Sequence, residues 1–306
     1  MAVPAGAIAA ERGMVRVSCL MAAHNAAGTI GAAVESVLRQ TRSDWELIVV
    51  DDGSTDGTGA VLAGIADARV MVLRQDRGGP SAARNRALAA ARGEFVAPID
   101  ADDVWLPRKL ELQVAVLEQT ADAAVAYGWT DFVDEGLRPL HGDRRPVFAG
   151  LVLEELLRKN FVACGSNTLM RRAAVVEAGG FDETLQAAED WELHTRLAAR
   201  YAFVPVPEVV VLYRRSPQSL SSRFWLVEQH FLAANRKVFA AAPAEARGLE
   251  GQTKASFYRY LLIRTVHSRS TAGRWRAVPR YAALAAWHDP REFMREVWRV
   301  VGSSIR

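Results

Sequence analysis

The feature that most constrains this 306-residue chain is an apolar run, Phe95–Ile99, that ends in acidic residues. Asp100, Asp102 and Asp103 place three carboxylates within four positions, where a buried strand would open to solvent. Carboxylates this close repel one another unless a cation lies between them. Mg²⁺ or Mn²⁺, held by one or two carboxylates and by substrate phosphates, would remove this repulsion. A turn in which Asp102 or Asp103 caps the following helix is the alternative, and this stretch alone does not decide between the two.

Strand and helix patterns alternate through the first part of the chain. Four apolar runs predict strands, and each is followed by a turn and a helical pattern. The runs are Val15–Ala22, Trp45–Val50, Arg69–Leu73 and Phe95–Ile99. This alternation predicts a Rossmann-like α/β fold with a mostly parallel, doubly wound sheet flanked by helices. Ligands of such sheets bind at the carboxyl ends of the strands, where the acidic and glycine-rich turns of this chain also fall.

The later part of the chain is less regular. Its patterns predict helices over 107–119, 151–158 and 190–199, strands over 123–129, 167–170 and 209–213, and a loop or edge hairpin over 130–150. From Phe224 onward only helical patterns remain, with breaks near Pro243, Gly273 and Asp289. We therefore expect a disordered, Ala/Gly-rich leader over 1–13, an α/β domain over 14–222 and a helical C-terminal extension over 223–306.

Composition argues against several classes of protein. The two cysteines, Cys19 and Cys164, both lie in apolar stretches, so neither a disulfide framework nor a zinc cluster is expected. There is no signal-peptide pattern and no apolar run of the roughly 18 residues that a spanning helix needs, which favours a cytoplasmic protein. A G-x-G-x-x-G after the first strand and a Walker sequence are both missing, so a dinucleotide site or a P-loop loses its main support.

The C-terminal residues 264–306 carry nine arginines against three acidic residues, with aromatic residues among them. Amphipathic basic helices of this kind suit peripheral contact with the inner face of a membrane. They equally suit a helical extension that packs on the α/β domain and leaves its arginines in water. No nucleic-acid-binding module is recognisable, so nucleic acid is not an expected partner.

Three further motifs place polar groups at the predicted ligand edge. The turn Asp51–Ser54 follows a buried strand, and a carboxylate there can accept hydrogen bonds from a nucleotide base or ribose. Arg84 and Asn85 lie one turn into a helix, where a guanidinium can pair with phosphate. Glu189 and Asp190 open another helix, and an anionic carboxylate facing a cleft is a candidate general base. Each motif also has an ordinary structural explanation: a capping turn, a surface arginine and a stabilised helix start.

Taken in order, these motifs resemble family 2 of the glycosyltransferases. They are His24-Asn25, Val49–Asp56, Gly79–Asn85, Asp100–Asp103 and Glu189–Glu192, and the similarity extends over about residues 15–221. The resemblance implies a GT-A fold and an inverting transferase that moves a sugar from a nucleoside diphosphate, expected to be a UDP-sugar, to a hydroxyl of a saccharide or lipid-linked acceptor. It also implies Mg²⁺ or Mn²⁺ and a role in cell-surface polysaccharide or glycolipid synthesis. The alternatives are a sugar-phosphate nucleotidyltransferase and a non-catalytic nucleotide-sugar-binding protein.

The same resemblance implies roles for individual residues. On the donor side Asp52 would contact the base, Asp100 would lie near the ribose and Asp102 would hold the metal. The full set of implied donor-binding residues is Ala23, Asn25, Asp52, Arg84, Asp100, Ala101 and Asp102. Asp190 is the implied general base, with Glu189 beside it. The implied acceptor-side residues are Gly165, Ser166, Asn167 and Trp191.

The chain departs from the family pattern at Ser216, where many members have a histidine near the metal or diphosphate. Arg215 or Arg223 would neutralise the diphosphate in its place. His194 stands where the family often has an aromatic residue. We expect His194 to pack or to line the acceptor side and not to ligate a metal.

Overall fold

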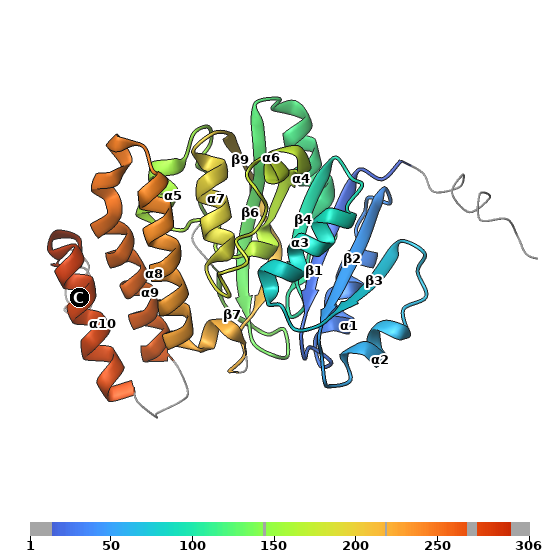
Figure 1. Cartoon of the computed structure of the whole chain (residues 1–306), viewed down its shortest axis with the longest axis horizontal. Coiled ribbons are helices and arrows are strands. Elements are labelled where there is room, and N and C mark those ends of the chain that lie inside the picture. The colour runs from blue at the N-terminus through green and yellow to red at the C-terminus, as the bar shows by residue number, and fades with distance from the viewer. Residues whose placement is uncertain (1–13, 143–144, 218, 268–273, 295–306) are drawn as a thin grey trace, which may run out of the picture. The chain divides into compact units, whose positions relative to one another are not determined.

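The computed structural model describes residues 14–142, 145–217, 219–267 and 274–294 (Figure 1). The chain divides into two compact units, residues 1–152 with 161–234 and residues 153–160 with 235–306. The first unit thus extends into helix α8 (Phe224–Ala241), past the boundary predicted at 222/223, which remains a prediction. The predicted leader over 1–13 and the predicted break at Gly273 lie outside the described residues.

Within the described residues, the strands form one mixed sheet of nine strands. Their order is β3-β2-β1-β4-β8-β6-β9-β5, with β7 paired to β6. Figure 1 shows β3, β2, β1 and β4 side by side in this order. The strands are β1 (Val17–Ala23), β2 (Trp45–Asp52), β3 (Val70–Gln75), β4 (Phe95–Asp100), β5 (Val104–Trp105), β6 (Ala123–Val133), β7 (Pro139–Gly142), β8 (Thr168–Arg171) and β9 (Ala202–Arg214).

The parallel half of the sheet aligns the strand ends that carry the predicted site. β1 lies between β2 and β4, and its register pairs Ala23 with Asp51 and Ala22 with Asp100. Every residue of β2 is buried, as expected for a parallel strand covered on both faces. The turns after β1, β2 and β4 therefore open at one edge, where a ligand of a parallel sheet binds.

The half of the sheet that contains β8, β6 and β9 departs from the regular alternation of parallel strands and helices. β8 runs antiparallel to both β4 and β6, whereas β6 and β9 are parallel. β9 is longer than the predicted strand over 209–213 because it continues through Pro205 and Pro207, with shifts of register against β6. Proline ordinarily indicates the end of a strand or an irregularity in it, so the strand predicted from the sequence pattern was too short. The edge hairpin considered for 130–150 is present as β6 and β7.

The helices of the first unit connect the strands. They are α1 (Ile30–Leu38), α2 (Thr58–Ala63), α3 (Pro80–Ala90), α4 (Lys109–Gln119), α6 (Arg172–Glu177) and α7 (Glu189–Ala198), with short 3₁₀ turns η1 (Gly165–Asn167) and η2 (Leu220–Ser222). Pro80 starts α3, where its missing N–H leaves no helical bond unmade. Cys19 and Cys164 are both buried and free in this unit.

The second unit is helical. It contains α5 (Leu153–Arg158), the end of α8, the 3₁₀ segment η3 (Ala244–Leu249), α9 (Glu250–His267) and α10 (Arg274–His288). α9 and α10 lie side by side (Figure 1), and the Tyr258 ring stacks on Tyr281 and on His288. The Thr253 hydroxyl donates to the Leu157 carbonyl oxygen (2.7 Å), which ties α9 to α5. No helix among the described residues is both long and apolar enough to cross a membrane.

Candidate active site at the carboxyl edge of the sheet

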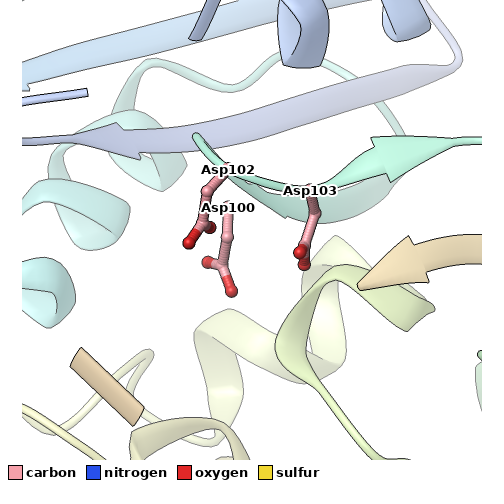
Figure 2. A group of neighbouring side chains, drawn as sticks. All are labelled: Asp100, Asp102 and Asp103. Atoms are coloured by element: carbon pink, nitrogen blue, oxygen red, sulfur yellow. The ribbon is translucent and has the colours of Figure 1, made fainter. Parts of the chain in front are cut away.

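Three carboxylates gather in the turn that follows β4 (Figure 2). The Asp103 N–H donates to the Asp100 carbonyl oxygen (3.1 Å), and this turn brings carboxylate oxygens of Asp100, Asp102 and Asp103 within 4.8 Å of one another. Burial, reinforced by the Asp100 carboxylate, raises the pKa of Asp102 to about 6. Crowded carboxylates of this kind favour a bound cation. Because all the donors are hard oxygens, the cluster fits Mg²⁺ or Mn²⁺.

Asp103 differs from the other two acids because both of its oxygens are bonded within the chain. Oδ2 accepts from the Ser166 hydroxyl (2.6 Å), and Oδ1 accepts from the Arg214 N–H (3.0 Å). Asp103 is fully buried, and burial raises the pKa of its carboxyl group well above the usual value. Asp100 and Asp102 thus remain as the acids open to a cation. The sequence analysis did not recognise this bracing role, which depends on residues distant along the chain.

Arg84 joins the acidic turn to the first residue of α7. Its guanidinium is 5% exposed and donates to Asp100 Oδ1 (2.5 Å) and to Glu189 Oε1 (2.7 Å). The two carboxylates lie more than 80 residues apart along the chain, yet one side chain spans them. The sequence analysis expected this arginine to contact the nucleotide, and in the structure both of its terminal nitrogens contact acids of the protein.

Asp190 occupies the second position of α7, partly exposed, and faces Gly165 of η1. A Cβ atom at Gly165 would lie 3.5 Å from Asp190 Cβ and 3.8 Å from Asp190 Oδ2. Burial of the carboxyl group, together with repulsion from Glu189, raises the pKa of Asp190 to about 7. A carboxylate with a pKa near neutrality is suited to accept a proton during a reaction.

The loop after β1 supplies two of the predicted donor residues. Ala23 is the buried last residue of β1, and Asn25 adopts a left-handed backbone (φ 49°). The Asn25 N–H donates to the Ser54 hydroxyl (3.0 Å), and its Oδ1 accepts from the Thr55 N–H (2.9 Å). Asn25 therefore joins the loops after β1 and β2 at the ligand edge. Ala101, another predicted donor residue, lies buried within the acidic turn.

Asp52, at the end of β2, is buried and saturated with hydrogen bonds. Oδ1 accepts from Gln75 Nε2 (2.8 Å) and the Gly78 N–H (2.7 Å), and Oδ2 accepts from Arg77 Nη1 (2.8 Å) and the Gly79 N–H (2.9 Å). An ionised carboxylate offers about four acceptor positions, so all are filled by the chain. A nucleotide base that bonds Asp52 must therefore replace one of these donors.

A surface hollow of about 640 Å³, largely open to solvent, lies beside Asp52. It is lined by Gly53, Ser54, Arg74, Gln75, Asp76 and Arg86. The sequence analysis predicted the β2 turn but not the residues at the end of β3 and directly after it, nor the exposed side of α3. The polar run Arg74–Arg77 directly after an apolar strand is the signal that points to them.

The predicted acceptor-side residues separate into two groups in the structure. Gly165 faces Asp190, whereas Ser166 and Asn167 are buried and bonded to the surrounding chain. Asn167 Nδ2 donates to the Gly128 and Val162 carbonyl oxygens (2.8 and 2.9 Å). Trp191 is 4% exposed and packs with its ring centroid 5.2 Å from that of Phe231. Gly165 and Trp191 of this set border the candidate base, since the Trp191 N–H donates to Asp190 Oδ1 (2.7 Å). The acceptor-side assignment remains a prediction.

Ser216 and His194 are the two positions that depart from the family pattern, and the structure shows what surrounds each of them. The Ser216 hydroxyl donates to Glu135 Oε1 (2.9 Å), and the Arg215 guanidinium lies 3.9 Å from the centre of the Phe132 ring. His194 is 2% exposed, and burial lowers its pKa to about 3, so the imidazole is neutral at physiological pH. A buried neutral imidazole agrees with the packing role expected for His194.

The mixed sheet with its flanking helices has a GT-A-like fold, and comparison with known proteins places the chain in a family. The family model described as glycosyl transferase family 2 matches residues 18–179, and the chain belongs to that family. The predicted family, the GT-A-like fold and the enzyme class, a glycosyltransferase, are thereby confirmed.

Two relatives show how far the similarity extends. The UDP-Glc:alpha-D-GlcNAc-diphosphoundecaprenol beta-1,3-glucosyltransferase WfgD of Escherichia coli is 42% identical over 102 residues, 33% of this chain and 40% of its own length. The succinoglycan biosynthesis protein ExoO of Rhizobium meliloti is 42% identical over 119 residues, 39% of this chain and 33% of its own length. The matches thus cover well under half of these relatives.

Solved structures share the fold over most of the chain. Residues 1–349 of Staphylococcus aureus TarS in complex with UDP-GlcNAc superpose with a TM-score of 0.66 at 17% identity, over 88% of this chain and 81% of that one. The mannosyltransferase PcManGT of Pyrobaculum calidifontis, in complex with GDP-Man and Mn²⁺, gives a TM-score of 0.61 at 19% identity, over 96% and 81% of the two chains.

Gly165→Ala tests the space in front of Asp190. The added methyl makes only ordinary van der Waals contacts, so the variant is expected to fold with an unchanged melting temperature. Because the methyl occupies the space beside Asp190 Oδ2, the KM for the acceptor should rise about ten-fold. Steady-state kinetics with varied acceptor, alongside calorimetry of UDP binding, measure this. An unchanged acceptor KM would show that the acceptor does not approach over Gly165.

Proposed function

We propose that this protein is an inverting glycosyltransferase that moves a sugar from a nucleoside diphosphate donor, a UDP-sugar, to a hydroxyl group of a saccharide or lipid-linked acceptor. The observation that carries the proposal is the Arg84 bridge, which puts Asp100 and the Glu189-Asp190 pair at one edge of the sheet. Metal-binding acids and a proton acceptor are the two groups that such a transfer needs.

The donor would lie across the ends of β1, β2 and β4. An open surface hollow lies beside Asp52, and Gln75 and Ser54 line it and offer polar atoms to a nucleobase. Asp100 and Asp102 would hold Mg²⁺ or Mn²⁺, which supplies positive charge to the departing diphosphate. Relatives support a nucleotide donor, since WfgD is named for UDP-Glc and the superposed structures hold UDP-GlcNAc or GDP-Man.

The chemistry assigned to this chain is a single displacement. Asp190 accepts the proton of the acceptor hydroxyl, and the resulting oxygen nucleophile forms a bond to the anomeric carbon. The bond from that carbon to the diphosphate oxygen breaks, and its electron pair leaves with the nucleoside diphosphate. Because attack and departure occur on opposite faces, the anomeric configuration inverts.

The biological setting proposed is cell-surface polysaccharide or glycolipid synthesis. Two relatives support it: WfgD is a diphosphoundecaprenol glucosyltransferase by name, and ExoO is named as a succinoglycan biosynthesis protein. A cytoplasmic protein in peripheral contact with the membrane would suit a lipid-linked acceptor.

Two apolar side chains of the helical unit are available for such a contact. Ile263 of α9 is 57% exposed and Trp287 of α10 is 82% exposed, and apolar side chains of this kind can enter a membrane interface. Trp287→Ala is expected to weaken co-sedimentation with anionic vesicles at least about three-fold, and unchanged binding would argue against this contact.

Calorimetry of the wild-type protein with UDP, GDP and dTDP, each with and without Mn²⁺, tests the donor assignment. We expect UDP to bind only when Mn²⁺ is present, and the corresponding UDP-sugars then to be screened for transfer. Binding of GDP or dTDP alone would keep the transferase class and change the donor. Absence of binding by every nucleotide under every metal condition would overturn the proposal.

A further inference from the structure

One face of α3 contacts the loop that leads into the helix carrying the candidate base. Ser81, Arg84 and Asn85 lie at positions i, i+3 and i+4 of α3, so they share a face. All three bond to the segment that runs from Phe181 to Glu189. The segment ends one residue before Asp190.

Asn85 binds the loop through both ends of its amide group. Its Nδ2 donates to the Phe181 carbonyl oxygen (2.8 Å), and its Oδ1 accepts from the Phe181 N–H (2.8 Å). Nδ2 also donates to Glu183 Oε1 (2.9 Å). Gly180 makes this approach possible, because a Cβ atom there would lie 2.7 Å from Asn85 Oδ1.

Ser81 and Arg84 bond to the part of the loop that lies nearest in sequence to Asp190, the candidate general base. The Ser81 hydroxyl, 1% exposed, donates to the Leu185 carbonyl oxygen (2.8 Å), and Arg84 pairs with Glu189. Between these contacts, Ala188 adopts a left-handed backbone (φ 60°), which is unfavourable for a residue with a Cβ atom. Bonds on either side of Ala188 therefore stabilise the turn that orients Asp190.

The start of α3 is fixed from the donor side. Asp52 at the end of β2 accepts from the Gly78 and Gly79 N–H groups, directly before Pro80 opens the helix. α3 also packs against β1 and β2. A continuous set of contacts therefore runs from β2 through α3 to the Phe181–Glu189 loop.

We propose that Ser81, Arg84 and Asn85 are positioning residues that place Asp190 against the donor site, with Arg84 acting through its two acids and not as a ligand of the nucleotide. This inference rests on the proposed function. It gives the Gly79–Asn85 motif a role in transfer that is separate from nucleotide binding. Asn85 is the member to test, because it contacts the loop and none of the acids assigned to donor or metal.

The experiment compares wild type, Asn85→Ala and the control Gln119→Ala, which removes an exposed amide at the end of α4. We expect Asn85→Ala to lower kcat about 10- to 100-fold, since small misplacement of a reacting group has effects of this size. UDP affinity with Mn²⁺ should stay within about two-fold of wild type, because the amide of Asn85 is bonded to Phe181 and Glu183 and to none of the acids assigned to the donor or the metal. Gln119→Ala should leave both quantities unchanged.

A second comparison separates positioning from general weakening of the fold. If Asn85 acts through Asp190, Asn85→Ala added to Asp190→Asn should cause no further loss of rate. Hydrogen exchange of the Phe181 amide should also be faster in Asn85→Ala, and this readout needs no activity. Unchanged exchange and kcat would overturn the inference, as would a parallel loss of UDP affinity. A wild-type protein that neither binds nucleotide nor transfers sugar would instead overturn the proposed function, while the exchange result would still test the positioning contact.

Discussion

Replacement of Asp190 with asparagine is expected to slow sugar transfer by roughly 10²- to 10⁴-fold and to leave nucleotide binding intact, because the amide keeps the shape of the side chain but cannot accept the proton. The measurements are kcat at saturating donor and acceptor, and calorimetry of UDP with Mn²⁺. Loss of transfer with retained binding would also exclude the alternative that the protein only binds nucleotide sugars. A variant with wild-type kcat would remove Asp190 from the mechanism.

Glu189→Gln is the matched control for this variant. Glu189 is the neighbouring acid, but its carboxylate is paired with Arg84, and glutamine keeps an oxygen that can accept from the guanidinium. We expect kcat to fall by less than about ten-fold. If Glu189→Gln proved more damaging than Asp190→Asn, the assignments of base and positioning acid would have to be exchanged.

The same carboxyl group predicts the pH dependence of rate and stability. Asp190 must be ionised to accept a proton, and its pKa of about 7 makes the rate rise with pH and level off above neutrality. Because the pKa is raised in the folded protein, folding favours the protonated acid, and this stabilisation is lost as pH rises from about 4 to about 7. Asp190→Asn should therefore melt at a higher temperature than wild type at pH 8, which thermal denaturation measures.

Replacement of Asp102 with asparagine is expected to abolish the Mn²⁺-dependent part of UDP binding and to lower transfer at least about 100-fold, as expected when a carboxylate ligand of a catalytic metal is lost. Removing the charge also relieves its repulsion with Asp100, which helps raise the pKa of Asp102 to about 6. The metal-free variant should then melt above metal-free wild type at pH 8. A thermal-shift series with and without Mn²⁺ and UDP measures both effects.

Asp103→Asn distinguishes a ligand from a structural acid in the same turn. Asp103 accepts from the Ser166 hydroxyl and from the Arg214 N–H within the core. An amide has only one accepting oxygen, so one buried donor loses its partner, and the melting temperature is expected to fall. Stabilisation by Mn²⁺ and UDP should persist in this variant. Its disappearance would assign Asp103 to the metal site as well.

The sequence was most informative about the candidate site residues that lie at the ends of strands. Asp52, Asp100 and Asp102 follow apolar strands of a regular α/β repeat, so their position at one edge could be predicted from the pattern. The structure adds contacts between residues that are distant in the sequence, which the spacing of motifs does not reveal. Asp103 is bonded by Ser166 and Arg214, which lie 63 and 111 residues further along, and no local pattern reports such contacts.

The roles of Arg84 and Ser166 show the same limit. An arginine at this position of a helix predicts an anionic partner, but a phosphate and a carboxylate fit it equally well, so the sequence alone does not decide between them. Ser166 could be placed near the acceptor by family resemblance. Its hydroxyl, however, accepts from the Asp100 N–H (3.0 Å) and donates to Asp103, so both of its bonding roles are used inside the protein.

The saturated carboxylate of Asp52 has a consequence for how donor preference can change. Its four chain donors make it a fixed part of the fold even before a nucleotide arrives, so replacing it would disturb the start of α3 as well as any base contact. Arg77 is different, because its side chain is 49% exposed and supplies a single one of those bonds. In the proposed donor site, substitution of an exposed residue such as Arg77 would change the hydrogen bonds available to a nucleotide base and leave the other three bonds to Asp52 unbroken. Asp52 is thus part of the framework that holds the start of α3, whereas Arg77 is a position whose substitution leaves three of the four bonds to Asp52 in place.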